Sequence, residues 1–107
     1  MIAIHVIEGR FCPLVTCDTC GKRISDPGAA AVVFDMRAGE VTTTPQFAHK
    51  GRCHDALDAR METPGGFRPG WNEFGRWMAD LLHNAGLRGE TLTKATERAH
   101  DWAEVGL

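Results

Sequence analysis

The chain has 107 residues, with 12 Lys and Arg against 14 Asp and Glu and a formal net charge of −2 at pH 7. This length predicts one domain, or one core with a helical extension. The slight acidic excess argues against a large nonspecific nucleic-acid surface, which requires a basic excess. No apolar run approaches the length of a membrane span, so we expect no membrane contact.

The first seven residues predict a β-strand, because β-branched side chains alternate along them and Glu8-Gly9-Arg10 then ends the run. We interpret His5 in this strand as a packed or edge histidine rather than a metal ligand. The segment is short and lacks a basic leader, so it is not typical of a signal peptide. We therefore expect a cytoplasmic, reducing location, in which the four cysteines favour a metal over disulfides.

Two pairs of metal-type ligands follow. Cys17 and Cys20 form a Cys-x-x-Cys turn closed by Gly21, and His49 and Cys53 form the second pair. Glycine suits the positive φ that such a tight turn requires. Three thiolates and one imidazole are the tetrahedral set that Zn²⁺ prefers, so the sequence predicts one structural zinc ion per chain.

Three alternatives to this ligand set stay open. Cys17 and Cys20 could form a redox pair, but the loop after Gly21 does not fit the strand-to-helix context of that motif. His54 competes with His49 as the imidazole ligand, although a neighbour of Cys53 on a helix points elsewhere. Cys12 is an alternative thiolate, which we interpret as a small buried apolar residue.

Between the ligand pairs, residues 29–35 predict a strand, residues 37–40 a turn and residues 41–44 a returning β-branched strand. A helix is then predicted from about residue 51 to 62, and its first turn carries the last ligand, Cys53. This order of knuckle, hairpin and helix resembles the treble-clef zinc fingers over roughly residues 12–62. The ligand types resemble the LIM-like variants of that family, which use two cysteines, one histidine and one further cysteine. The gap between the ligand pairs is long for a LIM finger, so the resemblance implies the fold and the metal but no partner.

The remaining chain predicts a linker and two helices. Residues 64–70 are rich in Pro and Gly. Apolar residues then recur at helical spacing from Trp71 to Ala85, Gly86-Leu87 fits a Schellman stop, and a second helix runs from about residue 91 to 105. We therefore expect an α+β protein: a zinc-binding sheet and helix over residues 1–63, a linker over 64–70 and a helical hairpin over 71–107.

The predicted function is a protein-interaction module, including self-association, with Trp71 and Trp77 as candidate aromatic anchors. A weaker alternative is nucleic-acid binding, either by the second helix of the hairpin or by four cations near the metal: Lys22, Arg23, Lys50 and Arg52. A metal-dependent hydrolase, with His54 and Asp55 as acid–base groups, is the least favoured hypothesis, because four ligands leave no open position on the ion. We therefore expect no enzymatic activity.

Overall fold

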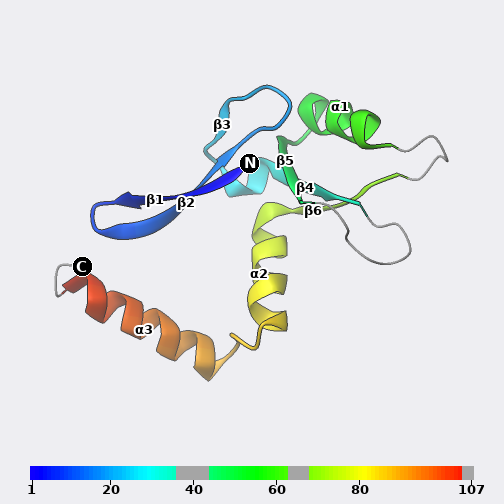
Figure 1. The fold of residues 1–107 in the computed structure, drawn as a ribbon. Coiled ribbons are helices and arrows are strands. Elements are labelled where there is room, and N and C mark those ends of the chain that lie inside the picture. Colours follow the sequence, from blue (N-terminus) through cyan, green and yellow to red (C-terminus); the bar gives the residue numbers. More distant parts are fainter. Residues whose placement is uncertain (36–43, 63–67, 105–107) are drawn as a thin grey trace.

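The structure is a computed structural model that describes residues 1–35, 44–62 and 68–104. It is an α+β fold in which two three-stranded antiparallel sheets and three α-helices are described (Figure 1). The elements in chain order are β1 (Ile2–Ile7), β2 (Arg10–Thr16), β3 (Arg23–Ile24), the 3-10 turn η1 (Pro27–Ala29), β4 (Ala30–Phe34), β5 (Gln46–His49), α1 (Arg52–Met61), β6 (Gly70–Glu73), α2 (Phe74–Asn84) and α3 (Glu90–Glu104).

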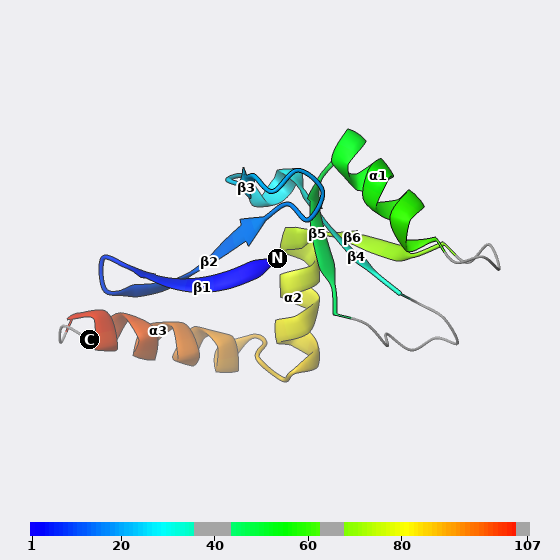
Figure 2. The same ribbon diagram turned by 45° about the horizontal axis from the view of Figure 1, so that its top comes forward.

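The first sheet has the strand order β1-β2-β3. Strands β1 and β2 form a hairpin around Glu8 and Gly9, which both have positive φ, 53° and 77°. Two such residues make the type I′ turn whose twist matches that of paired strands. Pro13 is tolerated in β2 because β3 is short and pairs with Val15 and Thr16 only. The hairpin therefore extends beyond β3 and projects from the body of the molecule (Figures 1 and 2).

The second sheet has the order β5-β4-β6 and carries the core. Residues 30–33 of the central strand β4 are fully buried, as expected for a continuous apolar run that is covered on both faces. Helix α1 lies on one side of this sheet and α2 on the other (Figures 1 and 2). Side chains from other elements complete the core: Val15, Cys17, Ile24, Phe47, Ala48, Leu57 and Phe74.

Several predicted elements of the first half are confirmed, and part of one predicted hairpin lies outside the described residues. The strands at residues 1–7 and 29–35 and the helix near 51–62 are present as β1, β4 and α1. The partner of β4 is β5, and the predicted turn at 37–40 and most of the predicted strand at 41–44 lie outside the described residues. One sheet was expected, whereas the described residues form two.

The second half differs from the predicted helical hairpin. Residues 70–73 form β6, which pairs with β4 and places Trp71 opposite Val33, so the helix begins at Phe74 and not at Trp71. The Schellman stop is present, since Leu87 N–H donates to the Leu82 carbonyl at 2.9 Å and Gly86 N–H to that of His83 at 3.1 Å. Helices α2 and α3 then diverge instead of packing side by side (Figure 1).

Candidate metal centre

The first ligand pair lies in a tight turn that follows β2. Cys17 N–H donates to the Lys22 carbonyl and Gly21 N–H to the Cys17 carbonyl, both at 2.9 Å. Gly21 has a φ of 75°, which confirms the predicted need for glycine. The N–H groups of Thr19 and Cys20 both point at the Cys17 sulfur, each at 3.4 Å. The turn therefore presents the two sulfurs together and offers hydrogen bonds to a thiolate.

The second pair is carried by the end of β5 and the start of α1. His49 is the last residue of β5, and Cys53 is the second residue of α1. The hydroxyl of Thr19 donates to the Cys53 carbonyl at 2.8 Å, which joins the turn of the first pair to the helix of the second. Two segments far apart in the sequence are thereby fixed against each other.

The structure brings all four predicted ligands together. The sulfurs of Cys17, Cys20 and Cys53 and one ring nitrogen of His49 lie within 4.8 Å of one another. The Cys20 sulfur is 3.5 Å from His49 Nδ1. A tetrahedral zinc ion with Zn–S near 2.3 Å and Zn–N near 2.0 Å places its ligand atoms about 3.5–3.8 Å apart. The cluster is therefore compatible with one metal ion after a small contraction.

The pKa values of two thiols in the cluster, Cys17 and Cys53, are shifted in opposite directions. Burial acts to raise the pKa of Cys17, but backbone hydrogen bonds from Cys20, His49 and Thr19, with the His49 side chain, lower that pKa to about 6. Burial raises the pKa of Cys53, and hydrogen bonds and charge from Cys17 and Cys20 raise it further, to about 11. Crowded sulfurs thus resist a second negative charge, and a divalent cation among them removes that conflict.

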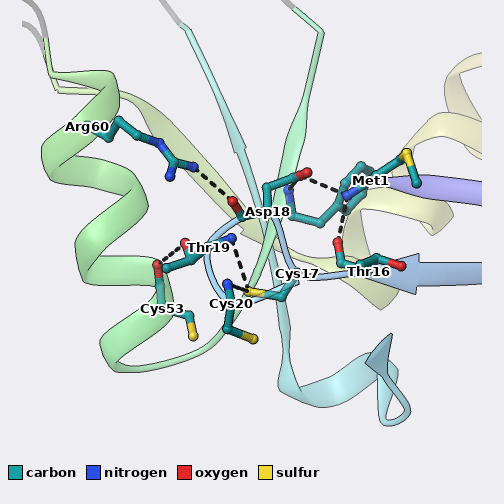
Figure 3. Close-up of polar contacts among 9 residues, drawn as sticks. Met1, Thr16, Cys17, Asp18, Thr19, Cys20, Cys53 and Arg60 are labelled. Carbon is teal, nitrogen blue, oxygen red and sulfur yellow. Dashed lines mark hydrogen bonds and ion pairs between the residues drawn. The ribbon is translucent and has the colours of Figure 1, made fainter. Parts of the chain in front are cut away.

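Asp18 connects the first ligand pair to β5 and α1, and sequence reasoning missed it (Figure 3). Its carboxylate accepts hydrogen bonds from the Phe47 N–H and from the Met1 ammonium, both at 2.8 Å. Its own N–H donates to the Phe47 carbonyl at 2.7 Å, and its carbonyl accepts from the Arg60 guanidinium at 3.1 Å. An acidic residue inside the Cys-x-x-Cys turn was the available signal, but its partners are distant in sequence.

The two alternative ligands lie outside this cluster. Cys12 is on the projecting hairpin, opposite His5. His54 is buried on α1, with its ring against Trp71 at a centroid distance of 4.9 Å. Its Nε2 lies 3.2 Å from Asp58 Oδ1, although the two atoms are not aligned as a hydrogen bond.

The residues predicted to form interaction surfaces differ in how far they are exposed to solvent. The cations Lys22, Arg23, Lys50 and Arg52 are all exposed. Trp71 is 52% exposed. Trp77, in contrast, is half-buried and packs edge-on against Phe47 at a centroid distance of 5.7 Å, so much of its ring serves the core.

Comparison with known proteins identifies no relative, because no protein-family model, curated protein or solved structure matches the chain. Within the described residues, no helix combines the length and the apolar character needed to cross a bilayer.

Proposed function

We propose that the chain is a protein-interaction module whose core is held together by one structural zinc ion bound to Cys17, Cys20, His49 and Cys53. The observation that carries the zinc assignment is the convergence of three sulfurs and one imidazole within 4.8 Å. Oxygen-preferring ions such as Mg²⁺ and Ca²⁺ are poorly suited to this donor set, whereas zinc takes it readily. The order of turn, hairpin and helix around the cluster supports a treble-clef-like arrangement.

A structural role is favoured over a catalytic one. Four protein ligands close a tetrahedral ion and leave no position for water or substrate. The acid–base groups of the hydrolase hypothesis are poorly placed, since the His54 ring packs against Trp71 and Asp55 is exposed in the first turn of α1. We therefore propose that the chain is not a hydrolase.

Protein partners are favoured over nucleic acid by the kind of surface that is exposed. Large apolar side chains are exposed on β1 and β2, with exposed fractions of 65% for Ile4, 66% for Val6 and 81% for Phe11. Exposed apolar clusters are typical of protein–protein contacts. The four cations near the cluster support the nucleic-acid alternative, but the net charge of −2 opposes it.

Metal analysis of the purified native protein tests the zinc assignment. We expect one zinc per chain, and we expect Cys17→Ser to lose both the zinc and the folded signal in circular dichroism, because metal-binding energy is folding energy in such a site. Cys12→Ser is the matched control and should retain both. A Cys17→Ser protein that stays folded, or a Cys12→Ser protein that loses zinc, would contradict the proposed site.

A gel shift on generic DNA at low salt separates the two kinds of partner. We expect no strong binding, and no change when Lys22 and Arg23 are both replaced by Ala. Strong binding that this double variant abolishes would instead support the nucleic-acid role.

A further inference from the structure

One face of the β1–β2 hairpin is apolar along its whole length. Directly paired residues share a face, and every second pair is apolar: Ile2 with Val15, Ile4 with Pro13 and Val6 with Phe11. At the base, Val15 is buried and Ile2 packs against the core. Farther out, Ile4, Val6 and Phe11 are each at least 65% exposed. These three side chains make an apolar patch on the order of 400 Å², within the range at which patches mark interaction sites.

The outer edge of the hairpin also has free hydrogen-bonding capacity. Met1 and Thr16 exchange both backbone hydrogen bonds, at 2.6 and 2.7 Å, so they are a hydrogen-bonded pair of the ladder. Bonded and non-bonded pairs alternate in antiparallel strands, and the N–H and C=O groups of Ile2, Ile4 and Val6 therefore point away from β2. Within the described part of the chain, β1 is an edge strand with β2 as its one neighbour.

Nothing in β1 blocks the addition of another strand. Its six residues, Ile2–Ile7, include no charged Lys, Arg, Asp or Glu and no proline. Natural edge strands are normally protected by such residues, by bulges or by covering segments. An unprotected edge beside an apolar face is a template for strand pairing.

We propose that β1 pairs with β1 of a second copy of this chain, antiparallel about a two-fold axis, with Ile4 opposite Ile4 and Ile2 opposite Val6. This proposal rests on the proposed role as a protein-interaction module and names its partner. The two hairpins become one four-stranded sheet, and the apolar faces of both copies become continuous. The contact is isologous, so the same strand serves both sides and the assembly closes as a dimer.

The register follows from the outward-pointing groups. In self-pairing, residues whose backbone points outward must face each other, so Ile2, Ile4 and Val6 must meet their counterparts from the same set. With Ile4 on the axis, all three take part. A register shift of two residues in one direction leaves one of the three without a partner. A shift in the other direction brings the turn residue Glu8 into the pairing. The central register also keeps every even-numbered side chain on the apolar face.

Self-complementarity is what favours a second copy over another partner. A centre at Ile4 places Ala3 opposite His5 and brings no like charges together across the axis. Edge pairing buries the outward backbone of β1 and the flanks of its side chains, which is less than the roughly 800 Å² per partner of a standard interface, and it leaves the joined apolar face exposed. We therefore expect a reversible dimer with a dissociation constant in the micromolar range.

Sedimentation equilibrium of the purified full-length chain, from about 5 to 500 µM, tests the proposal. We expect a concentration-dependent dimer. Ile4→Pro should raise the dissociation constant at least about tenfold, because it removes an N–H that points outward and leaves the β1–β2 ladder intact. Zinc content is measured on every sample and should stay unchanged, so a failure of the dimer is distinguishable from a failure of the metal site.

A charge-swap pair tests the register itself and does not depend on the proline variant. Ile4→Lys and Ile4→Glu should each be monomeric, because like charges would meet at the axis. An equimolar mixture should dimerise, since each Lys then faces a Glu. A wild-type chain that is monomeric throughout, an Ile4→Pro chain that dimerises as well as wild type, or a mixture that stays monomeric would overturn the proposal.

Discussion

At the scale of single residues, Asp18 joins the metal turn to the rest of the core. It lies between the two ligands of the first pair, yet its partners come from β5, α1 and the first residue of the chain. The buried Phe47 N–H depends on the Asp18 carboxylate as its acceptor. A change at Asp18 therefore reaches the fold as well as the cluster.

We predict that Asp18→Ala lowers the free energy of unfolding by about 1–3 kcal/mol, because it leaves the Phe47 N–H without its charged acceptor. Urea unfolding of the zinc-loaded protein measures this. Glu97→Ala on the exposed surface of α3 is the control and should change stability by less than about 0.5 kcal/mol. Equal effects of the two variants would contradict the role of Asp18.

The thiols of the cluster predict how zinc binding depends on pH. Near neutral pH, Cys17, with a pKa of about 6, is already a thiolate, whereas Cys53, with a pKa of about 11, holds its proton. The proposed zinc ion would bind both as thiolates, so its uptake must release the Cys53 proton, and we expect zinc affinity to rise with pH. Below about pH 6 a proton on Cys17 also competes, and affinity falls more steeply.

Calorimetric titration with zinc in two buffers of different ionisation enthalpy measures this proton release. We expect at least about one proton per zinc near neutral pH. We also expect chelator competition to show the affinity rising at least about tenfold per pH unit between about pH 6.5 and 8. A pH-independent affinity over that range would contradict the thiolate assignment.

At the scale of elements, buried side chains of α1 hold the helix in place independently of Cys53 and the candidate metal site. Leu57 is fully buried against the second sheet, while neighbouring positions on α1 such as Ala56 are exposed. The helix thus positions Cys53 through packing at its middle. Helix α2 also has a buried residue, Phe74 at its start, whereas Leu81 near its end is 47% exposed.

We predict that Leu57→Ala costs about 2–5 kcal/mol of stability, since it removes buried methyl groups and leaves a cavity. Leu81→Ala is the matched control on α2, and it should cost less than about 1 kcal/mol because the side chain is 47% exposed and lies outside the core. Thermal unfolding of both zinc-loaded variants makes the comparison. A Leu57→Ala protein as stable as Leu81→Ala would show that the metal alone holds α1.

At the scale of the whole molecule, the structure is elongated. Its radius of gyration is 16.2 Å, compared with about 13 Å for a compact domain of this length. The hairpin of β1 and β2 and the helix α3 both extend from a core built on the second sheet (Figure 2). Within the described residues, α3 has no extensive contact with another helix or strand.

This arrangement predicts uneven protection of backbone amides. A helix without tertiary packing is marginal in water even at fifteen residues. We expect amides of α3 to exchange at least about tenfold faster than those of α2, and those of β4 to be the slowest. Hydrogen exchange followed by mass spectrometry measures this. Protection of α3 equal to that of β4 would show that α3 packs against a surface in solution.

Features that depend on local chemistry could be predicted from the sequence. Five predicted features are each set within a few residues. They are the ligand types, the glycine after Cys20, the alternation in β1, the apolar run of β4 and the Gly86-Leu87 helix stop. The convergence of His49 with the cysteines was also predicted, from ligand spacing.

Features that depend on residues distant in sequence could not be predicted and are visible only in the fold. Four residues at 70–73 are too few to show a strand period, and they become β6 because β4 offers an edge to pair with. Trp77 packs inward because Phe47 lies beside it, and Asp18 is important because Phe47, Arg60 and Met1 meet it. The separation of α3 from α2 could not be predicted from the sequence either. An apolar stripe shows that one face of a helix can be covered, but it does not show which surface covers it.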